Sequence, residues 1–231
     1  MTAELIYPIT LHLNGRPCVV VGGGRVAARK VRDLLAAGAL VTVISPSLSP
    51  ALAALAQQGD IDWRQKRYTP GDLRDLKALL VFAATDIPAV NRTVAQEARD
   101  CGAWVNVADE TAAGDFGNLI TLRRESLMVA VHTGGASALL SKRLLADIDA
   151  AIDPAYVTLA RWLAELRPLV KERIAAQEDR QRFWQVVMES DIFALLQSGD
   201  EAAARKMLDA FWDSFVGANG RSPLPGDESA S

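Results

Sequence analysis

The chain has 231 residues, of which 50% are hydrophobic and 23% are charged, and its formal net charge at pH 7 is −3. This composition is typical of a soluble globular protein that is long enough for one large domain or two small ones. So small a net charge gives no general attraction to nucleic acid or to anionic lipid, so neither is an expected partner.

Targeting signals and disulfides are not expected either. The first residues lack the basic-then-apolar pattern of a signal peptide, and no apolar run reaches the ~18 residues of a membrane span. The two cysteines, Cys18 and Cys101, each lie in an apolar stretch. A reducing cytoplasm is therefore the predicted compartment.

Strand and helix patterns alternate through the first half of the chain, which favours a parallel sheet covered by helices. The first of these runs, Pro17 to Val21, is apolar without polar alternation, as is typical of a strand buried on both faces. Parallel strands are predicted at residues 17–21, 40–44, 61–64, 79–83 and 104–107, and helices at residues 26–37, 48–58 and 88–101.

The pattern changes after Asp109. Two apolar runs, residues 119–122 and 127–131, flank a polar stretch and predict an antiparallel hairpin. From Ser137 to about residue 211 the spacing is helical, with breaks predicted at Pro154, Pro168 and Gly199.

The predicted fold class is therefore α/β, with an N-terminal Rossmann-type parallel sheet, a small α+β dimerisation segment and a C-terminal helical domain. The corresponding boundaries are residues 1–112, 113–150 and 151–216, followed by a disordered tail at residues 217–231, which are rich in small and polar side chains. The hairpin is too short to form a complete sheet alone, so a homodimer is expected to complete it.

A glycine-rich turn follows the first predicted strand. Its sequence, Gly22-Gly23-Gly24-Arg25-Val26-Ala27, fits G-x-G-x-x-A between a strand and a helix. The first glycine permits the tight turn, the second lets backbone approach a pyrophosphate, and the helix N-terminus attracts the phosphates. The turn predicts a dinucleotide site; the alternative is a tight turn in an α/β protein that binds no nucleotide.

The end of the second strand lacks the acidic residue that usually holds the adenosine ribose of NAD. Here the sequence is Ile44-Ser45-Pro46-Ser47, so a serine hydroxyl or backbone groups would take that role. Arg25 is either a contact for a 2′-phosphate or a solvated side chain. The choice between NAD and NADP stays open from these residues.

Asp109 comes just after the last parallel strand, at the edge of the sheet where ligands bind in open α/β folds. A carboxylate there is a candidate general base, and the alternative is a helix-cap or turn aspartate. Gly134 and Gly135 follow an apolar strand, where they allow either close approach of a ligand or a simple turn.

Several segments, in this order and spacing, resemble the bifunctional precorrin-2 dehydrogenase and sirohydrochlorin ferrochelatase family of sirohaem synthesis. The resemblance runs from about residue 6 to residue 212, and no methyltransferase module follows, as in the free-standing form of the enzyme. The segments are Gly22 to Lys30, Phe82 to Asp86 with Asn91, Asn106 to Asp109, and Leu127 to Ser137.

The resemblance implies two reactions. NAD⁺ takes a hydride from precorrin-2 to give sirohydrochlorin, and ferrous iron then enters the macrocycle as a substrate. Asp109 would accept protons in both steps. The resemblance implies a homodimer, and the cofactor contacts that it implies are Gly24, Arg25, Val26, Pro46, Ser47 and Thr85. Gly22 and Gly23 are cofactor-binding candidates from the turn itself.

The implied tetrapyrrole carries many carboxylates, so its site should present cations, for which arginine forks are well suited. The alternative for each of the basic residues is an ordinary solvated position. Candidate substrate residues are Arg123, Arg124, Lys142, Thr133, Gly134, Gly135 and Ser137, with Arg143 nearby. No protein-borne metal site is predicted, because His12 and His132 are far apart and no metal-ligand spacing is present.

Four positions depart from the family pattern. Leu119 and Ala138 stand where proline is usual, Thr133 stands where serine is usual, and His132 is uncommon. The departures at Thr133 and Ala138 leave a dehydrogenase without chelatase activity as one alternative. A non-catalytic module that senses NAD is a second alternative of a different class.

Overall fold

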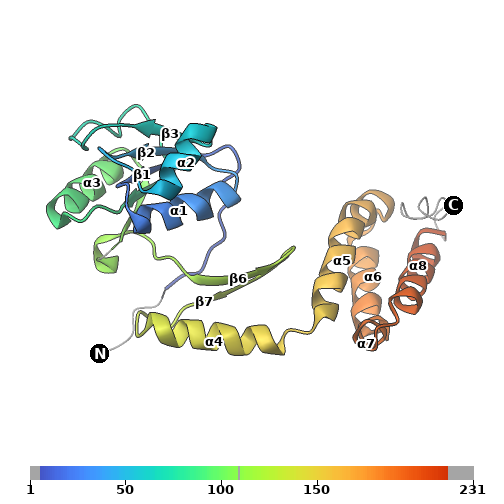
Figure 1. Ribbon diagram of the computed structural model, residues 1–231. Coiled ribbons are helices and arrows are strands. Elements are labelled where there is room, and N and C mark those ends of the chain that lie inside the picture. The colour runs from blue at the N-terminus through green and yellow to red at the C-terminus, as the bar shows by residue number, and fades with distance from the viewer. Residues whose placement is uncertain (1–5, 109, 218–231) are drawn as a thin grey trace. The chain divides into compact units, whose positions relative to one another are not determined.

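A computed structural model describes residues 6–108 and 110–217 of the chain. They form two compact units that divide between Asn118 and Leu119. The first unit runs from blue to green in Figure 1, and the second from green to red.

The first unit is built on a five-stranded sheet with the order β3-β2-β1-β4-β5, and every neighbouring pair is parallel. The predicted parallel sheet is therefore confirmed. The strands are β1 Pro17–Val21, β2 Leu40–Ile44, β3 Ile61–Arg64, β4 Leu80–Ala83 and β5 Trp104–Val107.

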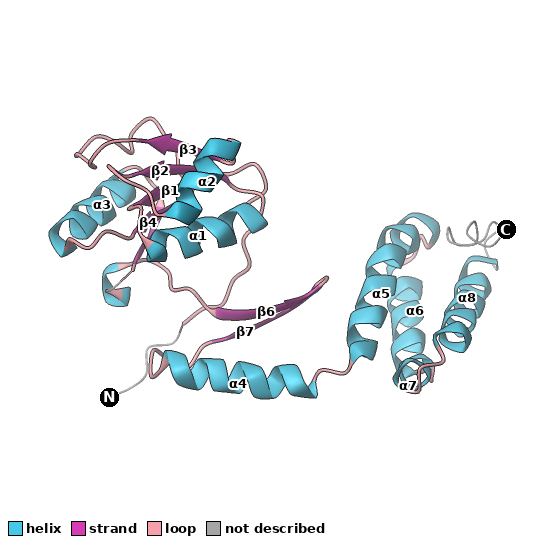
Figure 2. Cartoon of the chain, viewed as in Figure 1, coloured by secondary structure: helices cyan, strands magenta, loops and turns pink. Residues whose placement is uncertain are grey.

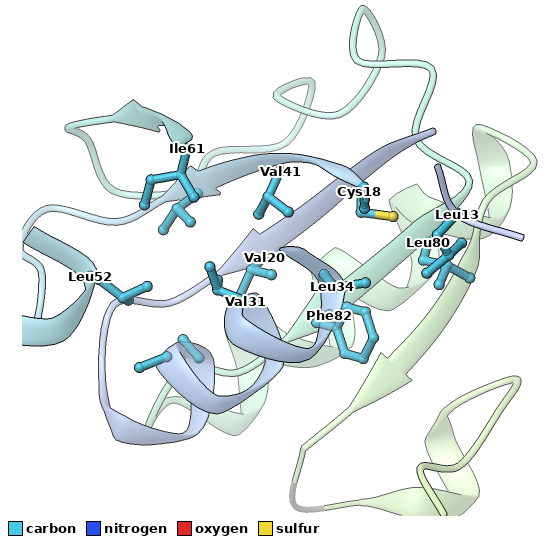
Figure 3. Packing of buried hydrophobic residues seen from close by; sticks show 14 residues of the cluster. Leu13, Cys18, Val20, Val31, Leu34, Val41, Leu52, Ile61, Leu80 and Phe82 are labelled. Atoms are coloured by element: carbon cyan, nitrogen blue, oxygen red, sulfur yellow. The ribbon is translucent and has the colours of Figure 1, made fainter. Parts of the chain in front are cut away.

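Helices cover both faces of this sheet: α1 Arg25–Ala36, α2 Pro50–Gln58 and α3 Pro88–Asp100. Val20 of β1 packs in one buried cluster with Val31 of α1 and Leu52 of α2, as Figure 3 shows. Val19 and Val21 point to the other cluster, which includes α3. Because β1 is buried on both faces, its continuous apolar sequence is explained.

The strand order changes direction at β1. The chain proceeds from β1 to β2 and β3 on one side, and β4 and β5 lie on the other side. The carboxyl ends of β1 and β4 are therefore a topological switch point, the place where open α/β sheets bind ligands.

One buried carboxylate holds the long connection between β3 and β4. Glu97 of α3 is 9% exposed, and its oxygens accept hydrogen bonds from the Gly71 and Leu73 amides at 2.9 and 3.1 Å and from the Tyr68 hydroxyl. Burial and the neighbouring Glu97 raise the pKa of Tyr68 above its usual value. Glu97 thus has a structural role that satisfies three donors of one loop.

The segment after β5 stays with the sheet. The Asp115 carboxylate accepts hydrogen bonds from the Val105 amide at 3.0 Å and from Arg99 at 2.8 Å. Asn106 Nδ2 donates to the Phe116 carbonyl at 2.8 Å. These contacts keep residues 113–118 in the first unit, whereas the predicted boundary stood at residue 112.

The second unit begins with the predicted antiparallel hairpin, formed by β6 Ile120–Arg124 and β7 Leu127–Val131. Its turn is Glu125-Ser126, with Glu125 at φ 50°, so the hairpin is tighter than the polar stretch 123–126 suggested. The hairpin packs on α4, Ala138–Ala151.

After α4, the described part of the second unit consists of helices joined by loops, as Figure 2 shows. The helices are α5 Pro154–Arg173, α6 Gln177–Glu189, α7 Ile192–Gln197 and α8 Glu201–Gly217. Phe183 is fully buried, with Trp184, Trp212 and Phe215 in edge contact. No helix in the described ranges is both long enough and apolar enough to cross a membrane.

The break predicted at Pro168 is wrong, because Pro168 lies inside α5. An internal proline costs a helix about 3 kcal/mol through a lost hydrogen bond and a steric clash. Leu166 and Val170, which are 3% and 1% exposed, flank Pro168 and anchor both parts of α5 in the core. Pro154 and Gly199, by contrast, do stand at helix boundaries.

Candidate functional site

The first two glycines of the turn after β1 are required by the fold. Gly22 has φ 127°, and a Cβ there would lie 2.3 Å from the Ala84 carbonyl oxygen. A Cβ on Gly23 would lie 1.9 Å from the Ser47 carbonyl oxygen. No side chain fits at either position, because the obstructing atoms belong to the backbone of neighbouring loops.

Gly24 is different, since a Cβ there would meet nothing within 4 Å. Gly24 is the N-cap residue of α1, it provides no side-chain cap, and the first turn of α1 has no acidic residue. Among the described residues, these amide groups therefore have no capping side chain and no carboxylate in the first turn of α1, and they carry the positive end of the helix dipole. A pyrophosphate fits this arrangement in charge and in hydrogen bonding.

The loop after β2 lies beside this turn. The Ser49 amide donates to the Gly23 carbonyl at 2.7 Å. Ser45 is buried and its hydroxyl donates to the Ser47 carbonyl at 2.7 Å, while Pro46 and Ser47 are exposed. Ser47 is consequently the better placed of the two serines for a ribose hydroxyl.

The loop after β4 is fixed by a buried amide. Asn91 is 3% exposed, and its Oδ1 accepts hydrogen bonds from the Thr85 amide and hydroxyl at 3.1 and 2.7 Å. Its Nδ2 donates to the Thr85 carbonyl at 3.0 Å. Asn91, which the sequence analysis noted only as part of a motif, therefore positions Thr85 at the switch point.

Asp109, the predicted catalytic residue, lies outside the described residues. The preceding residue, Ala108, donates its amide to the Ala83 carbonyl at 3.0 Å, so the chain is still beside the end of β4 at that point. The role of Asp109 stays a prediction.

Four of the predicted substrate residues, Thr133, Gly134, Gly135 and Ser137, lie just before the start of α4. Ser137 caps α4 by accepting a hydrogen bond from the Leu140 amide at 3.3 Å, and the Thr133 hydroxyl lies 2.8 Å from the Ser141 hydroxyl. Gly134 and Gly135 have φ 62° and 78°, and a Cβ on either would meet nothing within 4 Å. The backbone conformation alone explains this glycine pair, and the space beside it is open.

The two hairpin arginines differ. Arg124 pairs with Asp149 at 2.7 Å and donates to the Asp149 and Ile152 carbonyls at the end of α4. Arg123 is exposed on the other face of the hairpin, and neither it nor Lys142 forms an ion pair with a described residue. Binding a substrate carboxylate would require Arg124 to leave Asp149, whereas Arg123 and Lys142 need no such change.

No group of three or more metal-binding side chains is present among the residues that the structure describes. His132 is exposed, and its Nδ1 accepts a hydrogen bond from the Gly134 amide at 3.1 Å.

Lys30 is a buried cation that sequence reasoning did not single out. It is 7% exposed, its Nζ donates to Asn118 Oδ1 at 2.7 Å, and it lies 5.4 Å from the centre of the Phe82 ring. Burial, and secondarily the charge of Arg29, lower the pKa of Lys30 from 10.5 to about 8, although Asp33 acts in the opposite direction.

Replacing Lys30 with methionine should alter how stability depends on pH. As the pH rises from about 8 to 10.5, the folded protein loses the Lys30 proton before the unfolded chain does. The unfolded state then binds more protons, so the contribution of Lys30 to stability increases over this range. The amount by which the free energy of unfolding of the Lys30→Met variant exceeds that of the wild type should therefore be largest near pH 7 and should shrink above pH 8.

Thermal unfolding from pH 7 to pH 10.5 measures this difference, with the exposed Lys206 changed to methionine as the control for removing one lysine charge. If the difference in melting temperature between Lys30→Met and the wild type stays constant with pH, the lowered pKa of Lys30 is contradicted.

Comparison with known proteins shows two matching family models. Residues 9–118 match the family described as "Putative NAD(P)-binding", and residues 155–211 match the "Sirohaem synthase dimerisation region".

Curated relatives match nearly the whole chain. A sirohaem synthase of Chromobacterium violaceum is 40% identical over 88% of this chain and 43% of its own length. Sirohaem synthases of Aeromonas salmonicida and Methylococcus capsulatus are 38% and 41% identical, over 95% and 88% of this chain and 47% and 43% of their own lengths. This chain therefore spans less than half of the length of these relatives.

A solved structure, SirC, described as a precorrin-2 dehydrogenase, matches with a TM-score of 0.74 and 27% identity, covering 90% of this chain and all of that one. The predicted α/β fold class and the predicted family resemblance are confirmed.

Proposed function

This chain is a homologue of the sirohaem synthases, and from that premise we propose that it oxidises precorrin-2 with NAD⁺ and then inserts ferrous iron into the product, sirohydrochlorin. The observation that carries the proposal is the uncapped start of α1 behind Gly24, in a chain 38–41% identical to sirohaem synthases. Iron is a substrate of the second step.

The cofactor would bind at the carboxyl edge of the sheet. Gly22 and Gly23 shape the turn, and the amides after Gly24 would hold the pyrophosphate, with Arg25 and Val26 at the exposed start of α1. Pro46 and Ser47 would contact the adenosine ribose, and Thr85, held by Asn91, would lie toward the nicotinamide. When bound, NAD⁺ supplies the acceptor for a hydride from precorrin-2.

Asp109 would take the protons that both reactions release. Oxidation removes a hydride and a proton from the macrocycle, and metal insertion removes two pyrrole protons. A carboxylate close to the bound tetrapyrrole can serve both steps, because each transfers a proton from the same ligand to a base.

The second unit would bind the carboxylates of the tetrapyrrole. Arg123 and Lys142 supply cations, and the open backbone at Gly134 and Gly135 leaves room beside Thr133. Arginine is well suited to carboxylates because its guanidinium donates two parallel hydrogen bonds.

A dehydrogenase without chelatase activity is the second candidate. The description of SirC names dehydrogenation alone, and Thr133 and Ala138 depart from the family pattern. A purely NAD-sensing module has no comparable support.

Absorbance spectra of the purified protein test these activities in sequence. Addition of precorrin-2 and NAD⁺ should give the sirohydrochlorin spectrum with equimolar NADH, and ferrous iron should then convert it to sirohaem faster than in protein-free buffer. Oxidation without faster metal uptake would support a dehydrogenase that lacks chelatase activity. No oxidation at all would overturn the proposed function.

We also propose a cytoplasmic homodimer. Both cysteines are free thiols, which is compatible with a reducing compartment. Three leucines on α4, Leu139, Leu140 and Leu144, are 76%, 53% and 43% exposed, and residues 155–211 match a dimerisation region. A second copy of the chain is the occupant that we propose for this apolar surface.

Replacing Leu140 and Leu144 with glutamate should therefore convert the dimer to a monomer, because the interface would have to bury two unpaired charges. Light scattering after size-exclusion chromatography measures the mass. Leu40→Glu, at a 62% exposed leucine of β2, is the matched control and should stay dimeric. A wild-type monomer at micromolar concentration, or a dimer that survives both glutamates, would contradict this interface.

A further inference from the structure

We propose that the first unit carries a second anion-binding site, at the edge of the sheet opposite the glycine turn, that takes a small phosphorylated or carboxylated molecule. This site is separate from the cofactor site proposed above and does not depend on it.

The site is a cavity of about 490 Å³ at the amino ends of the central strands. Arg16 precedes β1, Arg74 and Lys77 belong to the connection that leads into β4, and Cys101 and Gly102 join α3 to β5. The glycine turn follows the carboxyl end of β1, so the two sites lie at opposite edges of one sheet.

The charge of the cavity favours an anion. Apart from the Cys101 thiol, its ionisable lining side chains are Arg16, Arg74 and Lys77, and all three are cationic. None of the three forms an ion pair with a residue in the described ranges, whereas Arg99 in the same unit pairs with Asp115 at 2.8 Å. Arg16 from one chain segment and Arg74 and Lys77 from another line this one cavity, and their charges make the local potential positive.

Two nearby carboxylates, those of Glu97 and Asp100, weaken this potential and raise the pKa of Cys101, but they lie outside the cavity. Asp100 accepts a hydrogen bond from Gln96, and the Glu97 carboxylate is occupied by Tyr68 and two loop amides. Neither carboxylate lines the cavity.

The backbone at Lys77 has an uncommon conformation. Lys77 has φ 45°, a left-handed conformation that few residues other than glycine adopt. Such conformations concentrate at binding sites, where the local structure holds a side chain in a required direction.

The size of the cavity indicates the ligand class. A volume of about 490 Å³ exceeds what a bare phosphate ion fills and lies in the range of small-molecule pockets. Pro17, Ala78 and Leu79 provide apolar contacts for an organic part, and the arginine guanidinium groups match phosphate or carboxylate oxygens. A ligand bound between Arg16 and Lys77 would connect the starts of β1 and β4, the two strands whose other ends form the switch point.

Cys101 provides a local probe of this site. It is exposed and lines the cavity, while Cys18 is 1% exposed. Burial and nearby Glu97 raise the pKa of Cys101, Arg74 lowers it, and alkylation proceeds through the thiolate. A bound anion would slow alkylation both by covering the thiol and by disfavouring its charged form.

The experiment measures alkylation of Cys101 by N-ethylmaleimide in the full-length protein, with peptide mass spectrometry as the readout. Inorganic phosphate, pyrophosphate and citrate are titrated separately at constant ionic strength, with sodium chloride as the reference. At ten times the dissociation constant, protection should reach ~10-fold, because about one site in eleven stays free. Protection by the phosphates alone indicates a phosphorylated ligand, and protection by citrate alone indicates a polycarboxylate.

The double variant Arg74→Gln, Lys77→Gln should bind ~10-fold more weakly or worse, since two charged hydrogen-bond donors are removed. Arg32→Gln removes an exposed arginine of α1 outside the cavity. In this control variant, the anions should protect Cys101 from alkylation as strongly as they do in the wild type. Saturating NAD⁺ should leave the protection unchanged, because the proposed cofactor edge is elsewhere.

Three results would overturn the site: no protection beyond that of sodium chloride, equal protection in the double variant with an unchanged melting temperature, or loss of protection when NAD⁺ is added. Loss of the oxidation activity, by contrast, would bear on the proposed function and not on this site.

Discussion

Replacing Asp109 with alanine is expected to lower the rate of precorrin-2 oxidation by ~10²–10⁴-fold, the usual contribution of a general base. The affinity for NAD⁺ should stay within a few-fold of the wild type. The reason is that the pyrophosphate contacts come from the turn after β1, whereas Asp109 is proposed to act only on protons of the tetrapyrrole. Single-turnover absorbance gives the rate, and calorimetry gives the affinity.

Two further variants sharpen this result. Asp109→Asn keeps the size of the side chain and removes the base, so it should be as inactive as the alanine variant. Glu110→Gln neutralises the exposed neighbouring carboxylate and should retain activity. If Asp109→Ala lost NAD⁺ binding, or if Glu110→Gln were the inactive variant, the assignment of the base would be wrong.

The second large effect is expected at the glycine turn, where a substitution at Gly24 should weaken NAD⁺ binding and a substitution at Gly23 should weaken folding. Gly24→Ala should fold like the wild type, because its φ is −85° and no atom obstructs the new methyl group within 4 Å. That methyl group would occupy the space through which a pyrophosphate approaches the helix amides. NAD⁺ affinity should therefore fall by ~10-fold or more, equivalent to about 1.4 kcal/mol.

Gly23→Ala should act on folding instead. The methyl group would meet the Ser47 carbonyl at 1.9 Å, and relieving that overlap requires the backbone after β2 to move. A loss of about 1–3 kcal/mol in unfolding free energy is expected from overpacking, seen as a lower melting temperature. A Gly24→Ala variant that bound NAD⁺ like the wild type would exclude this turn as the pyrophosphate site.

Local sequence was sufficient for most of the first unit. Four strands, β1, β2, β3 and β5, begin and end at the predicted residues. In β1 and β2 the signal is a short β-branched run that stops at Gly22 or Ser45. The error at Pro168 has the opposite origin. Burial of Leu166 and Val170 overrides a local rule about proline, and a tertiary contact of that kind has no local signature.

The site was only partly predictable for the same reason. The turn from Gly22 to Gly24 follows from spacing alone, but the obstruction at Gly23 comes from Ser47, a residue of another loop. The bond from Lys30 to Asn118 joins positions 88 residues apart, and the pairing of Arg124 with Asp149 depends on how the hairpin packs on α4. Patterns within one segment cannot reveal partners that only the folded chain brings together.

The convergence of three donors on Glu97 determines how the connection between β3 and β4 can move. The amides of Gly71 and Leu73 and the hydroxyl of Tyr68 share one acceptor, so releasing that acceptor deprives all of them at the same moment. Local unfolding there is consequently a single cooperative event that also uncouples the loop from α3, and not a gradual fraying. The Gly71 and Leu73 amides are therefore expected to exchange with solvent together.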